Sequence, residues 1–527
     1  MIIAISVSPR TIPHLIRRAR DIDSANRRAV FVKLEAERQP ISAFSLDERE
    51  ELIGRGLRDR EAAVRKAACH LVASWLAQCD HDLVRLLESF DVLERTAMAE
   101  NALLSLFENQ PAITSTVNCS EASGFWATLT PESAVLARVF AAHCRGEDVD
   151  DAALPVLTAV AYQVEAAFDA LVRSVQMIAE SGGEASDEEA AEIHSRSFVL
   201  AQLLDLAGLM DYTDESGRRK MFALVRRMFA DEAVPVAIVP QILDVLRQLS
   251  ATEREYVQVV VEAVQTLREE TLARPDGLDE SDEDADEIIA EALTSATPVR
   301  RAANLQKPEA LDPSKLEHHQ RCLVIVRALL ERIEGSLQEH AEITGLFNEL
   351  IVPSVHMEDA TVREHGLVCL ALVLLLDRKT ARDMFGFFVN QLGATDVSTA
   401  IRVRVRQALF DLLLRFGVDF LEDRNQSTAK VMSFLLVLLD GEKEPAVATT
   451  VAVGLCKLLL SGLVRDHDAS VDAVGKLVEI YFSADAVANA ELRQCLAYFL
   501  PVYCYSAPSH QLAMRDVRRH TSVPERP

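Results

Sequence analysis

The sequence predicts an all-α protein built from stacked pairs of helices. Apolar residues make up 49% of the 527 residues and aromatic residues only 6%, a balance that favours helix-on-helix layers over β-sandwiches. The segment Arg55–Ala68 also resembles the segment Arg17–Val30, which lies 38 positions earlier. A motif that recurs at a fixed offset of this size is typical of a helical-repeat solenoid.

The repeated segment reads as a helix, a short acidic turn and a second helix with an arginine near its start. Asp21 aligns with Asp59 in the turn, and Arg27 aligns with Arg65 in the second helix. Arg363 holds the same place in a later pair. This arrangement is the signature of HEAT repeats, so we expect an α–α superhelical solenoid. Such chains usually bind partners rather than catalyse reactions.

Apolar periodicity places helices along the first half of the chain. Residues 52–57 carry their apolar side chains on one face, and residues 64–76 do so at steps of three and four. Thr130 and Pro131 mark another helix start, because an N-cap hydroxyl and a first-turn proline both favour one. Further helices are predicted over residues 151–179, 190–210, 216–230, 234–250 and 253–272. Of these, the helices over 190–210 and 216–230 are expected to form a pair.

The pattern breaks after residue 273 and resumes near His318. Residues 276–291 contain nine acids and no base, and prolines flank this run. Such a composition is typical of a disordered linker or a long loop. We therefore expect four regions, namely HEAT-type repeats over 1–273, an acidic linker over 274–316, HEAT-type repeats over 317–506, and a short helix with a flexible tail over 507–527.

Charge is distributed unevenly along the chain. The net charge of −26 and the pI near 5.0 disfavour a generic nucleic-acid coat, because phosphate binding needs clustered Lys and Arg. Residues 10–33, however, carry seven bases against two acids. The chain therefore has a basic end and an acidic segment, which could compete with DNA for a basic groove. Ser186 and Ser281 lie in acidic contexts, where phosphorylation would add negative charge.

Cysteine use and hydropathy predict the compartment. Nine scattered cysteines do not form a disulfide framework and indicate reduced thiols in the cytosol or nucleus. Residues 1–8 lack the features of a secretory signal, and the longest apolar run, Leu367–Leu376, is too short to span a bilayer. We expect a soluble intracellular protein.

No motif predicts catalysis, a cofactor or a metal site. Phosphate-binding glycine loops, zinc-protease helices and nucleophile elbows are missing from the sequence. The acidic run imitates the first ligands of a calcium loop, but Glu287 stands where glycine is needed and Leu293 where the bidentate acid is needed. We therefore expect no enzyme and no bound metal.

Three blocks of sequence resemble the CAP-G family, the HEAT-repeat subunits of condensin. The blocks together span roughly residues 9–506. They are Ile12–Arg28 with Leu46–Leu52 and Gly56–Arg60, then Val352–Val355 with Val362–Leu370 and Leu376–Lys379, and finally Leu492–Ser506. Members of this family extend further at the N-terminus, so we expect this chain to lack their N-terminal repeats.

The resemblance implies a non-catalytic subunit of a chromosome-organising complex. Its expected partners are a kleisin of the CAP-H type, the SMC ATPase heterodimer through the complex, and double-stranded DNA bound without sequence specificity. Neither a membrane nor a small-molecule substrate is expected. The implied location is the nucleus and mitotic chromosomes, with the cytoplasm outside mitosis.

Two sets of residues are candidates for function. Exposed cations that could track phosphates are Arg17, Arg18, Arg20, Arg28, Arg58 and Lys66. The second set would join neighbouring turns in a structural ladder and comprises Asp21, Arg27, Asp59, Arg65 and Arg363. For the first set the alternative is ordinary solvated surface, and for the arginines of the second it is contact with DNA.

A different class of function is a transport or scaffolding adaptor that binds basic peptides. The net acidity favours this alternative, whereas the three sequence blocks oppose it. The apolar helices predicted over 362–376 and 447–464 suit either internal packing or a peptide-binding groove. An enzyme with an unrecognised site is a third, remote alternative.

Overall fold

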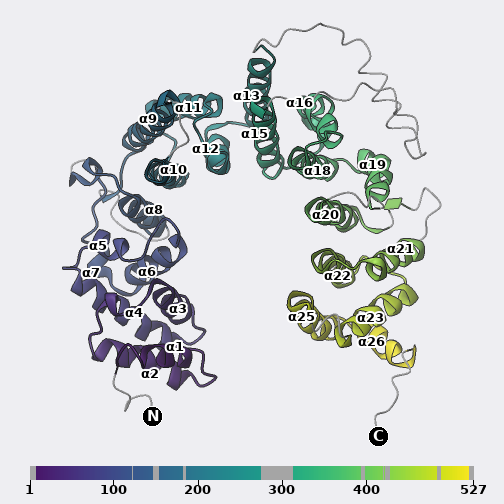
Figure 1. The fold of residues 1–527 in the computed structure, drawn as a ribbon, viewed down its shortest axis with the longest axis horizontal. Coiled ribbons are helices and arrows are strands. Elements are labelled where there is room, and N and C mark those ends of the chain that lie inside the picture. The colour runs from purple at the N-terminus through teal and green to yellow at the C-terminus, as the bar shows by residue number, and fades with distance from the viewer. Residues whose placement is uncertain are drawn as a thin grey trace. The chain divides into compact units, whose positions relative to one another are not determined.

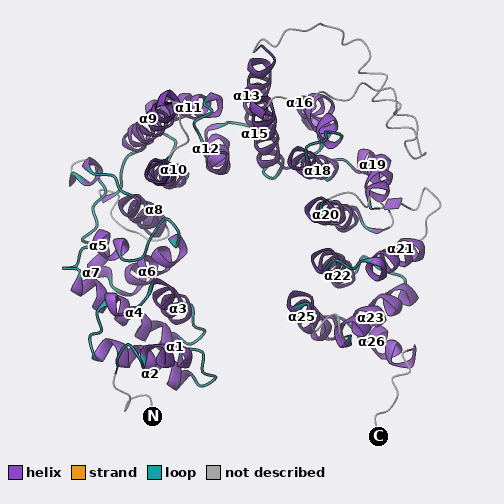
Figure 2. Ribbon diagram, viewed as in Figure 1, coloured by secondary structure: helices purple, strands orange, loops and turns teal. Residues whose placement is uncertain are grey.

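The computed structural model describes residues 7–120, 123–145, 153–181, 186–273, 313–392, 398–418, 420–421, 428–483 and 488–520. Regular structure in these ranges is helical, and they contain no β-strand (Figure 2). The chain divides into two compact units, Met1–Ala251 and Thr252–Pro527. Each unit is a stack of helix pairs, which confirms the predicted all-α helical-repeat fold.

The N-terminal unit contains twelve α-helices among its described residues (Figure 1). Their bounds, in chain order, are α1 Ile12–Arg18, α2 Ser24–Ala36, α3 Leu46–Gly56, α4 Ala62–Gln78, α5 Leu83–Glu88, α6 Thr96–Asn109, α7 Pro111–Thr114, α8 Pro131–Arg145, α9 Leu157–Ser181, α10 Asp187–Ala207, α11 Glu215–Ala230 and α12 Val239–Leu249.

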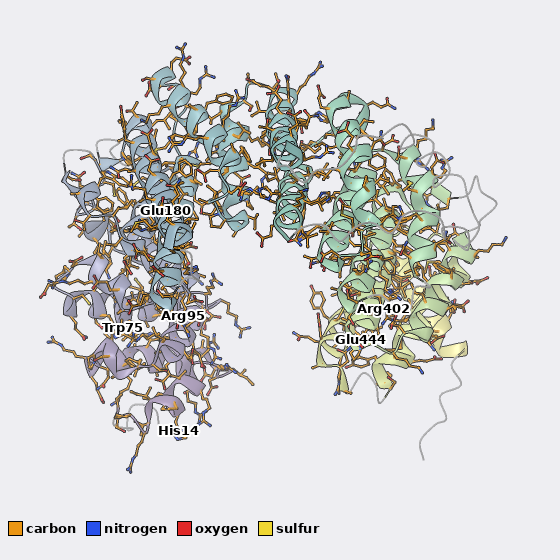
Figure 3. The ribbon with its side chains drawn as sticks, turned by 45° about the horizontal axis from the view of Figure 1, so that its top comes forward. His14, Trp75, Arg95, Glu180, Arg402 and Glu444 are labelled. Carbon is orange, nitrogen blue, oxygen red and sulfur yellow. The ribbon has the colours of Figure 1, made fainter. Side chains whose placement is uncertain are left out.

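A row of second helices forms the spine of this unit. Helices α2, α4, α6, α8, α10 and α12 each pack against the next one in the row. The large side chains of Phe31, Trp75 and Phe107 lie fully buried along this row, and Trp75 is labelled in Figure 3. The apolar stripe predicted over 64–76 is therefore the buried face of α4.

One predicted pairing is wrong. The sequence pattern pairs residues 190–210 with 216–230, but α10 packs against α9, and α11 packs against α9 and α12. Because α9 contacts both neighbours, apolar periodicity alone does not decide how the helices divide into pairs. Helix α9 also begins at Leu157, later than the predicted residue 151.

Aspartates and serines begin many of the helices. The hydroxyl of Ser45 accepts a hydrogen bond from the Glu48 backbone in a capping box, and Ser186 does the same with Glu189. Aspartate side chains cap six other helices, through Asp23, Asp82, Asp214, Asp359, Asp377 and Asp466. Negative charge at a helix N-terminus is favourable, so part of the chain's acidity has a local structural cause.

The C-terminal unit continues the same architecture. Its described α-helices are α13 Glu253–Ala273, α15 Pro313–Leu330, α16 Ala341–Leu346, α17 Val352–Val355, α18 Ala360–Leu374, α19 Arg378–Gln391, α20 Thr399–Phe416, α21 Thr428–Gly441, α22 Pro445–Leu460, α23 His467–Phe482, α25 Ala490–Ser506 and α26 Pro508–His520. Helices α15, α18, α20, α22 and α25 form its row of second helices.

A π-helical turn connects α16 to α17. It spans Phe347–Ile351 and ends two residues before Pro353. Proline has no backbone N–H and crowds the preceding turn, so a local widening of the helix accommodates it. Within the row, Gly454 of α22 lies against the ring of Phe410 in α20, where a β-carbon would overlap the ring.

The predicted acidic segment over 276–291 lies outside the described residues. Helix α13 ends at Ala273, and α15 begins at Pro313, inside the region expected to be a linker. The four predicted region boundaries therefore stay predictions.

A matched pair of glycines in α3 tests how tightly the helices pack. A β-carbon on Gly56 would lie 2.5 Å from the Ala68 β-carbon and 2.6 Å from Phe31 Cζ, whereas one on Gly54 would meet nothing within 4 Å. We expect Gly56→Ala to destabilise the N-terminal unit by about 1–3 kcal/mol through overpacking. Gly54→Ala should stabilise it by about 0.5–1 kcal/mol, since alanine favours a helix interior.

Thermal unfolding of the two variants, followed by circular dichroism, measures this difference. The midpoint should fall for Gly56→Ala and rise for Gly54→Ala. Shifts of the same sign in both variants would contradict the close approach of α3 to α2 and α4.

Candidate nucleic-acid interface

Arg27 joins the first two repeats. The Asp59 carboxylate accepts hydrogen bonds from Arg27 Nε at 2.6 Å and from Nη2 at 2.9 Å. The same guanidinium donates from Nη1 to the carbonyl oxygens of Asp21 and Ile22, at 2.9 and 3.0 Å. Arg27 is buried, so its charge is matched by a two-point carboxylate contact and by turn carbonyls.

Arg65 and Arg363 repeat only the carbonyl half of this arrangement. Arg65 Nη1 donates to the carbonyls of Asp59 and Arg60 at 2.7 and 3.0 Å, and Arg363 Nη1 donates to that of Met357 at 3.2 Å. In all three cases the arginine contacts the carbonyl six residues earlier. Of these three arginines, Arg27 forms the predicted ion pair with an aspartate of the neighbouring turn, whereas Arg65 and Arg363 donate to carbonyls of their own turns.

The aspartates of these turns also have local partners. The hydrogen bond from Arg27 lowers the pKa of Asp59, whose carboxylate also accepts a bond from the Glu61 backbone N–H at 2.9 Å. The backbone N–H of Asp23 lowers the pKa of Asp21. Both carboxylates are therefore held ionised as part of the turns.

Three of the predicted phosphate-binding cations have nearby partners. Arg17 lies 3.1 Å from His14 Nδ1 (His14 is labelled in Figure 3), and Arg18 pairs with Asp21 at 2.8 Å. Arg20 lies 3.6 Å from the Glu51 carboxylate. All three arginines are exposed, so these surface contacts are weak and open to competition by a stronger anion.

The other three cations face solvent with little or no neutralisation. Arg58 donates to the neutral amide oxygen of Asn101 at 3.2 Å. The side chains of Arg28 and Lys66 are exposed, and neither forms an ion pair or a hydrogen bond with another described residue. Among the six predicted cations, positive charge is therefore most available at Arg28 on α2, at Arg58 before α4 and at Lys66 near the start of α4.

A polar cavity lies beside these residues, between α4 and α6. Its volume is about 350 Å³, and its lining combines two cations with amide and hydroxyl groups. The lining residues are Leu57, Ala62, Arg65, Lys66, Asn101, Leu104, Ser105, Glu108 and Asn109. The two cations, Arg65 and Lys66, outnumber the one acid of this lining, Glu108, so the cavity can accept an anionic group next to Lys66.

Two groups of basic residues were not predicted from the sequence. One is the set of cations on α11, and the other includes Arg95, which joins two repeats. Helix α11 carries five bases and one acid in 16 residues, a signal that a count along the predicted helix would have found. Lys220 pairs with Glu165 at 2.5 Å, and Arg227 pairs with Asp169, so α9 neutralises part of this charge. Arg95 (labelled in Figure 3) holds Asp47 and Glu50 at 2.6 and 2.5 Å.

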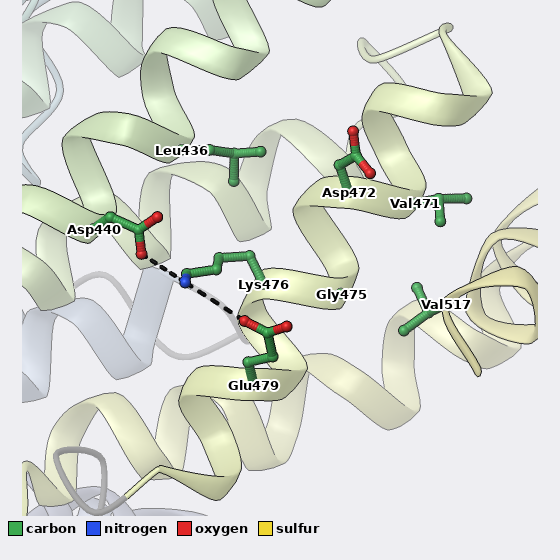
Figure 4. Close-up of a pocket in the computed structure, with 8 residues that line it drawn as sticks. All are labelled: Leu436, Asp440, Val471, Asp472, Gly475, Lys476, Glu479 and Val517. Carbon is green, nitrogen blue, oxygen red and sulfur yellow. Dashed lines mark hydrogen bonds and ion pairs between the residues drawn. The ribbon is translucent and has the colours of Figure 1, made fainter. Parts of the chain in front are cut away.

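A second cavity, in the C-terminal unit, has the opposite character. It lies between α21, α23 and α26, has a volume of about 230 Å³, and is drawn in Figure 4. Lys476 lies 2.6 Å from Asp440 and 3.5 Å from Glu479, and the contact with Asp440 raises the pKa of the lysine. Asp472 adds a third carboxylate, so this cavity does not suit a phosphate.

Neither a metal cluster nor a membrane-spanning helix occurs in the described part of the chain. The described residues contain no group of three or more His, Cys, Asp or Glu side chains placed to hold a metal ion. No helix among them combines the length and the apolar character needed to cross a membrane.

The fold and the repeated turns define the class of the protein as a HEAT-type helical-repeat solenoid. Residues 321–521 match the family described as nuclear condensing complex subunits, C-terminal domain. Condensin complex subunit 3 of Schizosaccharomyces pombe is 28% identical, over 97% of this chain and 57% of the relative. That of Saccharomyces cerevisiae is 26% identical, over 96% of this chain and 51% of the relative.

A solved structure agrees with these sequence matches. The crystal structure of the S. pombe condensin Cnd3-Cnd2 subcomplex aligns with a TM-score of 0.75 and 26% identity, over 98% of this chain and 63% of that chain. The chain is thus similar to condensin subunit 3 over nearly its whole length, and the resemblance predicted from the three sequence blocks is confirmed. This chain spans only 57% of the length of the S. pombe relative and 51% of the length of the S. cerevisiae relative.

The contact between Arg27 and Asp59 can be measured by a double-mutant cycle. We expect Arg27→Ala and Asp59→Ala each to lower the thermal midpoint by several degrees, because each leaves the partner's charge without its match. The double variant should lose less than the sum of the two. Arg28→Ala, which removes an exposed arginine next in the chain, is the matched control and should change the midpoint little.

The pH of this measurement follows from the depressed pKa of Asp59. A carboxyl whose folded pKa is lowered contributes stability that is complete above its ordinary value of 3.8 and is lost as the pH falls through the folded pKa. A cycle near neutral pH therefore captures the full coupling. Purely additive losses there would show that Arg27 and Asp59 do not act as a pair.

Proposed function

We propose that this chain is a non-catalytic condensin subunit that binds the kleisin and helps to hold double-stranded DNA during mitotic chromosome condensation. Its helix pairs supply a long binding surface, and its sequence matches condensin subunit 3 over nearly its whole length. The proposed location is the nucleus and mitotic chromosomes, and the SMC ATPase heterodimer joins it through the complex.

The similarity to the Cnd3-Cnd2 subcomplex supports the kleisin as the direct partner. The aligned S. pombe chain comes from a complex with Cnd2, and the alignment covers 98% of the present chain. Within each unit, a stack of repeats suits an extended polypeptide, because successive helix pairs offer successive contact points.

The cations of the first two repeats support a role in DNA binding. We propose that Arg28, Arg58 and Lys66 contact phosphates directly. Arg17, Arg18 and Arg20 would exchange their weak surface contacts for phosphates. Such contacts carry no base information, so binding would be independent of DNA sequence. Arg27, Arg65 and Arg363 would instead keep the turns in place, since their guanidiniums already bond turn carbonyls.

The alternative function is an adaptor that carries or scaffolds basic peptides. The acidic cavity around Lys476 and the net charge of −26 favour it. The two functions differ in the ligand that the full chain captures, so a single binding experiment distinguishes them.

Capture of a kleisin segment tests the first function. We expect the immobilised full chain to retain a CAP-H-type kleisin fragment at about equal molar amounts, because the complex requires one defined surface. A kleisin fragment of the same composition but scrambled sequence is the matched control and should not be retained. Retention of basic localisation peptides without retention of the kleisin fragment would favour the adaptor.

Salt dependence of DNA binding tests the phosphate contacts, with the kleisin segment present. We expect log K for a duplex to fall linearly with log salt concentration. In the variant Arg28→Ala/Lys66→Ala, the slope should become less steep by about 0.9 for each phosphate that the protein no longer neutralises. Duplexes of unrelated sequence should give the same result.

The control variant removes the same charge from another part of the unit. Arg85 and Arg219 are exposed and lie outside the six predicted cations, so Arg85→Ala/Arg219→Ala should leave the slope unchanged. Equal changes in both variants would mean that net charge, rather than these positions, governs binding. An affinity that does not change between about 50 and 200 mM salt would contradict phosphate contact altogether.

A further inference from the structure

The cavity between α4 and α6 is formed by one face of each helix. It takes positions 62, 65 and 66 from α4 and positions 101, 104, 105, 108 and 109 from α6, at the three- and four-residue steps of a helical face. Both are second helices of successive repeats, and they pack against each other. The cavity therefore belongs to the row of second helices and does not depend on a loop.

Ser105 gives this cavity a polar group below the surface. The residue is only 8% exposed, yet it lines the cavity. Its hydroxyl forms no hydrogen bond with a nitrogen or oxygen of another described residue. The thiol of Cys69 lies against Ser105, 3.4 Å from its carbonyl oxygen, but thiols are weak hydrogen-bonding groups. Most buried hydroxyls have a stronger partner, so that of Ser105 is available to a group that enters the cavity.

The charged residues of the lining carry a net positive charge. Arg65 donates from Nη1 to carbonyls of its own turn, and Lys66 has no partner among the described residues. Glu108 is exposed and opposes them, so two cations face one acid. A balance of one positive charge matches a single monoanionic group, whereas the charge of about −2 on a phosphate monoester would exceed it.

The depth of Ser105 favours a flexible ligand over a duplex. Phosphates of double-stranded DNA lie on the surface of a stiff rod, so they reach exposed cations such as Arg28 and Arg58 rather than a residue that is 8% exposed. A carboxylate at the end of an aspartate or glutamate side chain can enter the cavity. The rest of such a ligand would lie outside it, next to the exposed side chains of Arg65 and Lys66.

We propose that this cavity is a docking site for an acidic side chain of a partner polypeptide. The carboxylate of an aspartate or glutamate accepts a hydrogen bond from the Ser105 hydroxyl, and Lys66 neutralises its charge. The site goes beyond the proposed function, because Ser105 is not among the residues proposed to contact DNA. It shares Lys66 with the proposed DNA surface, so an acidic segment and a duplex would exclude each other at that residue.

Protection of Lys66 from acetylation measures occupancy of the site in the full chain. N-acetyl-glutamate N-methylamide carries the acidic side chain between two peptide groups, and it should slow the acetylation of Lys66 as followed by peptide mass spectrometry. Its neutral counterpart, N-acetyl-glutamine N-methylamide, should give no protection at matched ionic strength. Lys443 is exposed in the C-terminal unit and should react at the same rate with either compound present.

Two variants should shift this protection in opposite directions. Ser105→Ala should raise the concentration needed for half-protection about tenfold, because a hydrogen bond to a charged group is lost. Glu108→Gln should lower that concentration, since a charge of the same sign as the ligand leaves the cavity. Ser105→Ala should keep the thermal midpoint of the wild type, because its hydroxyl has only a weak partner in the folded chain. It should also leave the affinity for duplex DNA unchanged.

The docking site and the DNA surface therefore fail separately. Unchanged protection in Ser105→Ala, equal protection by the glutamine compound, or equal slowing at Lys443 would overturn the docking site and leave the salt dependence of DNA binding as it is. Stronger protection by N-acetyl-phosphoserine N-methylamide would assign the cavity to a phosphorylated segment, and stronger protection by dimethyl phosphate would assign it to the DNA backbone. Acetate as effective as the glutamate compound would assign it to free carboxylates. Each of these three results overturns the proposal.

Discussion

The structure depends on the packing of each second helix against the second helices of the neighbouring repeats. A single helix pair cannot cover its own apolar face, so burial is complete only when the next pair is in place. The row α18, α20, α22 shows how closely this brings the backbones together, because Gly454 lies directly on the ring of Phe410. Turns and exposed residues vary around this row, but the row leaves room for few changes in side-chain size.

The same residue types serve two purposes, and burial separates them. Arg27 is buried, satisfies turn carbonyls and binds Asp59, so little of its guanidinium is left for a ligand. Arg28 follows it in the chain but points to solvent without a partner among the described residues. Adjacent positions on a helix point in different directions, so Arg27 faces the neighbouring turn while Arg28 faces solvent and can bind an anion.

The repeat offset of 38 residues predicted the fold and the equivalence of Arg27 and Arg65, because periodicity reflects the helix pairs directly. The predicted ladder gives each arginine an aspartate in a neighbouring turn. Arg27 has such a partner in Asp59, whereas Arg65 binds carbonyls alone, and this difference depends on side chains of a neighbouring repeat. The pairing of α9 with α10 was missed because α9 contacts helices on two sides.

A chain with a net charge of −26 can still present a surface that binds a polyanion. At physiological ionic strength, exposed charges more than about 8 Å apart are largely screened from each other. Many of the carboxylates are held at helix N-termini or in ion pairs with arginines of the same surface, so they contribute little to the field elsewhere. The local balance at α2 and α4 therefore decides what binds there, and in that place Arg28 and Lys66 have no carboxylate partner among the described residues. Net acidity and a basic binding face are compatible because they act over different distances.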